Sequence, residues 1–257
     1  PSTVKAHDWP AFRTALEHIH RPTAPEDVTP ESAFRTRLAY DELFARQCAL
    51  RLRRQHRRKE PGRAVTGDGS LADKIIASLP FSPTGAQQRS VKEIYADMSE
   101  PAPMLRLLQG DVGSGKTLVA ALAMARAVEA GLQSAMMAPT DLLARQHGVT
   151  LQPLLEAAGI SMAVLTGRDK PKDRRAIMEK LAAGEISVVV GTHALFQDDV
   201  SFKDLGLSVI DEQHRFGVSD RMRMVAKGFA PHVLVMSATP IPRTLALSIH
   251  GDMDISI

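Results

Sequence analysis

The chain has 257 residues, of which 44% are hydrophobic and 24% are charged, and its formal net charge is +3. This length suits one or two domains, and the hydrophobic content is sufficient for a buried core, which excludes a disordered or fibrous protein. The near balance of charges does not by itself indicate a polyanionic partner, and no apolar run approaches the roughly 20 residues of a membrane-spanning helix.

The composition also bears on cellular location. The one cysteine, Cys48, allows neither an internal disulfide nor a cysteine-rich zinc site, and the absence of asparagine rules out N-glycosylation. Residues 1–10 are polar and do not contain the apolar core of a secretion signal. We therefore expect a cytoplasmic protein with no membrane partner. Because the sequence begins with proline instead of methionine, we also expect it to be part of a longer chain.

Residues 1–80 predict a helical linker segment with a basic helix end. A short helix is expected over Trp9–Ile19 and, after a proline-rich break, a long helix over Glu31–Lys59, which Pro61-Gly62 would end. The last turns of the long helix carry a basic cluster of Arg51, Arg53, Arg54, Arg57, Arg58 and Lys59. A solvated helix end and direct contact with phosphates both remain open as explanations of this cluster.

Residues 81–257 alternate short apolar runs with helical patterns. Strands are expected at Met104–Gln109, Ser134–Ala138, Met162–Thr166, Ile186–Val190, Leu207–Asp211 and Val233–Ser237. Helices are expected at Ala86–Met98, Lys116–Ala130, Asp141–Ala158 and Pro171–Ala183. Unbroken apolar runs are typical of strands buried on both faces, so this alternation predicts an α/β domain with a mostly parallel sheet flanked by helices. Ligands of such domains bind at the carboxyl ends of the strands.

One segment after the first of these strands matches the phosphate-binding pattern G-x-x-x-x-G-K-[ST]. Its glycines allow the backbone to curl so that successive N–H groups point at phosphate oxygens, and the following helix presents its positive end to the same group. The lysine is expected to reach the β and γ phosphates, and the threonine hydroxyl is expected to bind Mg²⁺. The predicted nucleotide-binding residues are Gly110, Asp111, Val112, Gly113, Ser114, Gly115, Lys116 and Thr117.

A pair of carboxylates follows the strand predicted at Leu207–Asp211. Asp211 ends the apolar run, and Glu212 comes one residue later. Such a position suits an acid that holds Mg²⁺, which assigns the metal to Thr117 and Asp211. Glu212 would accept a proton from the attacking water, so the predicted catalytic residues are Lys116, Asp211 and Glu212.

The loop alone does not decide which nucleotide enzyme this is. The sequence has no Asn-Lys-x-Asp signature, which argues against a GTPase. A small-molecule kinase with the same loop remains open at this point. Thr140, Thr166 and Thr192 each follow an expected strand, so they should line one edge of the sheet, where hydroxyls and backbone N–H groups can bind phosphates without reading bases.

Several further segments, in their order and spacing around this loop, resemble superfamily 2 DNA helicases and, within them, the RecG family. The resemblance extends from about residue 34 to the end. The matching segments are Arg37–Leu43, Phe81 to Gln87, Met137–His147, Thr166–Arg168, Gly191–Phe196, Asp211–Val218 and Ser237–Leu245.

The resemblance implies roles for residues outside the phosphate loop. Phe81 and Gln87 would bind the adenine, with the Gln87 amide on its edge. The implied nucleic-acid contacts are Pro139, Thr140, Arg145, Thr166, Gly167, Arg168, Gly191, Thr192 and His193. The implied residues that couple hydrolysis to DNA movement are Gln213, His214, Phe216, Ser237, Ala238, Thr239 and Arg243.

For the whole chain, the resemblance implies a first RecA-like ATP-binding lobe over residues 81–257 behind a helical linker at 1–80. The implied enzyme is an ATP-dependent, Mg²⁺-dependent DNA helicase, expected to be monomeric, that remodels replication forks and Holliday junctions in recombination and repair. A second RecA-like lobe with an arginine finger and a DNA-wedge domain would lie outside these residues. Because such a finger is worth roughly 10³–10⁵ in rate, the 257 residues alone should hydrolyse ATP poorly.

Two alternatives remain. The translocase lobe of a transcription-repair coupling factor shares the segments Arg215–Val218 and Thr239–Leu245, but Gln213 and the segment near Tyr40 favour RecG. A kinase with a phosphate-binding loop predicts a small-molecule acceptor pocket and no effect of DNA on nucleotide binding.

Overall fold

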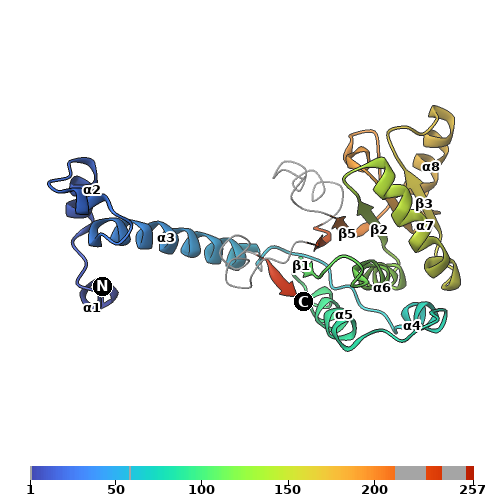
Figure 1. The fold of residues 1–257 in the computed structure, drawn as a ribbon. Coiled ribbons are helices and arrows are strands. Elements are labelled where there is room, and N and C mark those ends of the chain that lie inside the picture. The colour runs from blue at the N-terminus through green and yellow to red at the C-terminus, as the bar shows by residue number, and fades with distance from the viewer. Residues whose placement is uncertain (1, 58, 212–229, 239–252) are drawn as a thin grey trace. The chain divides into compact units, whose positions relative to one another are not determined.

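The computed structural model describes residues 2–57, 59–211, 230–238 and 253–257 (Figure 1). The chain divides into two compact units, Pro1–Gln55 and His56–Ile257. The division predicted from the sequence lay at 80/81. The difference arises because residues 59–79 pack into the second unit: Val65 is buried, and Ile75 of helix α4 (Ser70–Ala77) belongs to the same core as the main α/β helices.

The first unit is helical. It contains α1 (Ser2–Ala6), α2 (Phe12–His20), the 3-10 helix η1 (Pro25–Val28) and α3 (Ala33–Arg57), which continues to the boundary between the units. Aromatic contacts hold these helices together: the rings of Trp9 and Tyr40 lie 5.0 Å apart, and those of His18 and Phe34 lie 4.2 Å apart. Helix α3 corresponds to the long helix predicted at Glu31–Lys59.

The second unit is built on a parallel sheet. Within the described residues it has seven strands in the order β3-β4-β2-β5-β6-β1-β7, and every neighbouring pair is parallel. The predicted α/β fold with a mostly parallel sheet is therefore confirmed. The strands are β1 (Leu105–Gln109), β2 (Gln133–Met137), β3 (Met162–Leu165), β4 (Val188–Gly191), β5 (Leu205–Asp211), β6 (His232–Ser237) and β7 (Asp254–Ser256).

Both faces of the sheet are covered, as the apolar strands require. Alternate residues point to opposite faces, so Val188 and Val190 join one core cluster and Val189 joins the other. The first cluster includes α4, α5 (Gly85–Met98), α6 (Lys116–Glu129) and α7 (Asp141–Ala157). The second includes Leu181 of α8 (Pro171–Ala183) and Leu195 of the 3-10 helix η2 (His193–Phe196).

The strand register aligns the carboxyl ends at one edge. Gly191 of β4 lies opposite both Met137 of β2 and Leu165 of β3. In the same way Gln109 of β1 lies opposite Ser237 of β6. The loops that follow β1, β2, β3 and β4 therefore all leave from one edge, as expected for a ligand site in a parallel sheet.

The opposite, amino edge is held by His232 at the start of β6. Its Nδ1 accepts a hydrogen bond from the Met104 N–H (3.0 Å), and its Nε2–H donates to the Arg63 carbonyl (2.8 Å). Burial lowers the pKa of this imidazole, and the Arg63 carbonyl opposes that shift only in part. The Arg63 guanidinium also binds Asp204 with two 2.6 Å hydrogen bonds, which fastens the segment before α4 to the sheet.

None of the helices that the structure describes is both long enough and apolar enough to cross a membrane.

Candidate functional site

The phosphate-binding loop connects β1 to α6. Gly113 and Gly115 have positive φ angles of 81° and 79°, a backbone conformation that other residues adopt only with strain. Gly115 caps α6, so Lys116 and Thr117 form its first turn. The Lys116 Nζ donates to the carbonyls of Gly110 (2.7 Å) and Asp111 (2.8 Å). The ammonium therefore lies inside the curve of the loop, in the space that a phosphate would fill.

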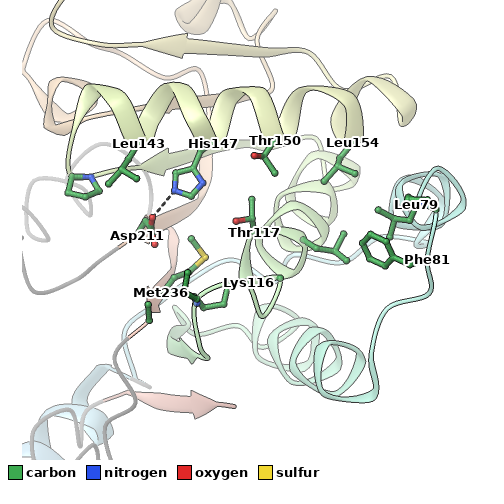
Figure 2. A pocket seen from close by; sticks show the side chains of 17 residues that line it. Leu79, Phe81, Lys116, Thr117, Leu143, His147, Thr150, Leu154, Asp211 and Met236 are labelled. Atoms are coloured by element: carbon green, nitrogen blue, oxygen red, sulfur yellow. Dashed lines mark hydrogen bonds and ion pairs between the residues drawn. The ribbon is translucent and has the colours of Figure 1, made fainter.

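A cavity of about 790 Å³ opens above this loop (Figure 2). Its volume falls in the range of ligand pockets, roughly 300–1,000 Å³. Lys116, Thr117 and Asp211 all line it, so folding brings the end of β5 to the loop after β1. The remaining lining is mostly apolar and comes from Leu79, Pro80, Phe81, Val112, Leu118, Pro139, Leu143, Leu154, Met236 and Ala238, with Gly113, Gly115, His147 and Thr150.

One wall of the cavity is a single face of α7. Figure 2 shows Leu143, His147, Thr150 and Leu154 pointing from this helix toward the loop, at the spacing of residues that share a helical face. His147 contacts Asp211 directly: Nε2 lies 2.7 Å from Oδ2. His147 ends the matching segment Met137–His147 but has no individual role predicted from the sequence, because a lone histidine on a helix has no signal until the opposing strand end is known.

Of the two predicted adenine residues, Phe81 lines the cavity and Gln87 does not. Phe81 is exposed and lines the cavity. Gln87 lies at the start of α5, where its Oε1 accepts the Thr84 N–H (2.8 Å) and its Nε2 donates to the Ser114 carbonyl (2.9 Å). A side chain at Gly115 would collide with the Gln87 amide. In this structure, therefore, the amide contacts the phosphate loop itself.

The three threonines predicted to line one edge follow β2, β3 and β4, which are neighbours in the sheet. Thr140 caps α7 by accepting the Leu143 N–H (3.3 Å). Thr166 and Thr192 are buried. The Thr166 Oγ accepts a hydrogen bond from the Arg145 guanidinium (3.2 Å). Because these two hydroxyls are buried, they are better placed to hold the loops in position than to contact a ligand.

Two crossed ion pairs join the start of α7 to the loop after β3. Arg145 on α7 binds Asp169 in the loop at 2.9 Å, and Arg168 in the loop binds Asp141 on α7 at 3.3 Å. The Asp169 carboxylate also accepts the Thr166 N–H. Both arginines predicted to contact nucleic acid are thus paired with carboxylates, although their side chains stay 54% and 85% exposed.

The other predicted nucleic-acid residues occupy mixed positions. Gly167 is exposed in the loop after β3, beside Arg168. His193 is exposed at the start of η2. Gly191 ends β4, and a side chain there would strike the Leu165 backbone. Pro139 lines the nucleotide cavity, so its position is on the nucleotide side of α7.

The predicted coupling residues are described only in part. Ser237 ends β6, and its carbonyl accepts the Gly110 N–H (3.3 Å), which joins β6 to the phosphate loop. Ala238 follows and lines the cavity. The catalytic candidate Glu212 and the coupling candidates Gln213, His214, Phe216, Thr239 and Arg243 lie outside the described residues.

The chemistry of the cavity fits a Mg²⁺-bound nucleoside triphosphate. A backbone loop with two left-handed glycines, an ammonium and the first turn of a helix provide hydrogen-bond donors for phosphate. A hydroxyl from Thr117 and a carboxylate from Asp211 are oxygen ligands of the kind that Mg²⁺ prefers. Among the described residues, no separate cluster of three or more His, Cys, Asp or Glu side chains suggests another metal site.

Comparison with known proteins agrees with this arrangement. Residues 84–247 match the DEAD/DEAH box helicase family. The ATP-dependent DNA helicase RecG of Acidithiobacillus ferridurans is 48% identical over 249 residues, covering 97% of the chain and 36% of the relative. RecG of Bacillus subtilis is 46% identical over 254 residues, covering 98% of the chain and 37% of the relative. The chain thus spans about a third of the length of these curated relatives.

Solved structures show the same likeness. A structure of RecG bound to a three-way DNA junction matches with a TM-score of 0.79 and 43% identity, over 98% of the chain and 34% of that structure. A DEAD box protein from Methanococcus jannaschii matches with a TM-score of 0.54 and 19% identity, over 74% of the chain and 53% of that structure, which supports the fold alone.

Proposed function

Since the chain belongs to the DEAD/DEAH box helicase family, we propose that its α/β unit is the first RecA-like motor lobe of a RecG-like DNA helicase. The observation that carries the proposal is the meeting of Lys116, Thr117 and Asp211 in one cavity beneath α7. The substrates proposed for the whole protein are ATP and branched DNA, namely replication forks and Holliday junctions. The relatives reported above are RecG helicases, which favours this proposal over a transcription-repair coupling factor or a kinase.

In this proposal the lobe binds ATP through backbone and side-chain groups that are already in place. Lys116 would exchange its two carbonyl acceptors for β- and γ-phosphate oxygens, a stronger charge-assisted contact. Thr117 and Asp211 would hold Mg²⁺. The bound ion would neutralise charge on the phosphates. Glu212 would accept the proton of the attacking water, and Phe81 would stack on the adenine.

The nucleic-acid edge is proposed to contact the DNA backbone. The exposed groups there are Arg145, Gly167, Arg168 and His193, while the buried Thr166 and Thr192 would hold the loops in position. Phosphate contacts carry no sequence information, which suits a protein that moves along any sequence. A second RecA-like lobe and a wedge domain are proposed to complete the enzyme, which acts as a cytoplasmic monomer.

The central test of the proposal is Glu212→Gln in the full protein that carries this sequence. ATP affinity should stay within about twofold of wild type, whereas turnover should fall by about 10²–10⁴ because the water loses its base. ATP hydrolysis by the unaltered protein, measured as phosphate release, should rise more with a three-way junction than with linear duplex DNA. Equal turnover with and without DNA would contradict a motor function.

A second measurement concerns the 257 residues alone. They should bind ATP with Mg²⁺ weakly and hydrolyse it slowly, because the proposed arginine finger belongs to the second lobe. Fast, DNA-stimulated phosphate release by these residues alone would contradict the role given to that lobe.

A further inference from the structure

The contact between His147 and Asp211 joins two elements that are far apart in the sequence. His147 belongs to α7, and Asp211 ends β5. Their side chains are only 14% and 13% exposed, and Nε2 lies 2.7 Å from Oδ2. A hydrogen bond this short between two largely buried groups fixes the orientation of both.

The direction of this hydrogen bond follows from its acceptor. A carboxylate has only acceptor oxygens, so Nε2–H donates to Oδ2. No other described side chain forms a hydrogen bond with Asp211. Asp211 lines the cavity together with Lys116 and Thr117. The imidazole thus leaves one carboxylate oxygen for a ligand and holds the other.

His147 and Thr150 are the polar residues between two leucines of the same helical face. Leu143 precedes His147 by one turn, and Leu154 lies two turns beyond it (Figure 2). An apolar residue could pack at position 147 as Leu143 and Leu154 do, so simple packing does not explain an imidazole here. The hydrogen bond to Asp211 does explain it.

We propose that His147 is a positioning residue for the Mg²⁺ site: it holds the Asp211 carboxylate so that its free oxygen faces the metal bound with ATP. This inference rests on the proposed function. It follows a general property of metal sites, in which hydrogen bonds to a ligating group orient that group, and their loss typically lowers metal affinity or activity by 10–100-fold.

The same helix carries a group of the nucleic-acid edge. Arg145 lies two residues before His147 and binds the loop after β3 through Thr166 and Asp169. Helix α7 thus carries both a proposed DNA contact, Arg145, and the residue that binds Asp211.

The test compares three substitutions at position 147 in the full protein. His147→Ala removes the donor. His147→Gln can place its amide nitrogen near the position of Nε2, and His147→Asn holds its amide closer to the helix. Val149→Ala, at an exposed position of α7, is the matched control, because it alters the same helix without facing the cavity.

The first readout is binding, not turnover. The dissociation constant of a non-hydrolysable ATP analogue is measured by calorimetry across a range of Mg²⁺ concentrations and without Mg²⁺. His147→Ala and His147→Asn should raise the Mg²⁺ concentration for half-maximal binding by about tenfold. His147→Gln should restore it to within about threefold, Val149→Ala should match wild type, and binding without Mg²⁺ should be the same in every variant.

A kinetic readout accompanies the binding data. At saturating Mg²⁺ the kcat of His147→Ala should approach that of the wild type, whereas at low Mg²⁺ it should fall. A Mg²⁺ requirement unchanged in His147→Ala would overturn the proposal. So would a Gln variant that behaves like the Ala variant, because the donor would then not be what matters.

Failure of the proposed function is separable from failure of this inference. If Lys116→Ala binds the analogue as tightly as wild type, the nucleotide site itself is wrongly assigned. If Lys116→Ala loses binding while every His147 variant keeps the wild-type Mg²⁺ dependence, only the positioning role is wrong.

Discussion

The two halves of the sheet's carboxyl edge hold their cations in different ways. On the nucleotide half, the Lys116 ammonium rests on two neutral carbonyls of its own loop. On the nucleic-acid half, Arg145 and Arg168 are paired with the carboxylates of Asp169 and Asp141. Among the residues that the structure describes, Lys116 at this edge thus has neutral partners, whereas Arg145 and Arg168 have anionic ones.

This difference has an energetic meaning for the two proposed ligands. A phosphate that reaches Lys116 replaces neutral acceptors by charged ones, so the exchange is favourable. A phosphate that reaches the half-exposed Arg145 replaces one carboxylate by another anion, so the exchange gains much less than it does at Lys116. Tight nucleotide contacts and weak, exchangeable DNA contacts would suit the proposed movement along DNA.

The largest expected effect comes from removing the cation of the nucleotide half. Lys116→Ala should weaken nucleotide binding by at least about 30-fold, because each hydrogen bond to a charged group is worth about 1.5–3 kcal/mol. DNA affinity should stay within about twofold. Titration with a fluorescent nucleotide measures the first quantity, with the exposed Lys180→Ala as control. If Lys116→Ala also lost DNA binding, the nucleotide and nucleic-acid halves of the edge would not bind their ligands independently.

A smaller effect is expected on the nucleic-acid half. Arg145→Ala should lower the affinity for a three-way junction by about fivefold and reduce the slope of log K against log salt by about one, as for the loss of one phosphate contact. Nucleotide affinity without DNA should not change. Fluorescence anisotropy at several salt concentrations measures both quantities. An unchanged salt slope would remove Arg145 from the DNA interface.

The carboxylate partner sharpens the comparison further. Asp169→Asn should raise junction affinity by about two- to threefold, because phosphate then competes with a neutral amide instead of a carboxylate. Anisotropy again provides the measurement, and Asp173→Asn, exposed in the first turn of α8, is the control. A loss of affinity would mean that Asp169 serves mainly to orient Arg145.

The smallest effect is expected at the amino edge, where a change of pH or of His232 should alter the folding stability without altering the binding of nucleotide or DNA. The pKa of His232 is lowered by burial, so the unfolded chain binds this proton more readily than the folded one. Stability from His232 is thus present above the unfolded pKa near 6.5 and is lost as pH falls through the lowered folded pKa. Between pH 7 and pH 5.5 the free energy of unfolding should fall by about 1 kcal/mol at most through His232, which lowers Tm by a few degrees.

His232→Asn provides the comparison for that measurement. Its carbonyl can accept the Met104 N–H, but it does not titrate. Thermal unfolding followed by circular dichroism should therefore show a flatter pH profile in this variant, with unchanged nucleotide and DNA affinity at pH 7. If the variant shows the same pH profile as the wild type, the loss of stability at low pH comes from titratable groups other than His232.

Local patterns predicted much of the fold. The helix expected at Pro171–Ala183 is α8 without change, and the apolar run Leu207–Asp211 became β5 with two residues added at its start. Strand β7 was missed because three residues cannot form a recognisable pattern. Helix α4 was missed as well, because its place in the core depends on contacts with α6, such as the burial of Ile75, that no local signal announces.

The site was predictable where its chemistry lies in one segment. The loop Gly110–Thr117 has a recognisable spacing, and Asp211 follows a recognisable strand. The contact of His147 with Asp211 spans 64 positions and depends on which face of α7 meets the end of β5. Likewise, no pattern indicated that Arg145 and Arg168 are paired with Asp169 and Asp141, because those pairs form only when the loop after β3 meets α7.

The two hydrogen bonds between Lys116 and its own loop have a consequence for the reaction cycle. If the proposed ATP hydrolysis takes place here, the ammonium can return to the carbonyls of Gly110 and Asp111 when the products leave, so its charge regains hydrogen-bond partners. The loop then keeps its curvature while it is empty. A nucleotide that binds there would meet a loop whose backbone is already folded, and the Lys116 side chain would only have to change acceptors.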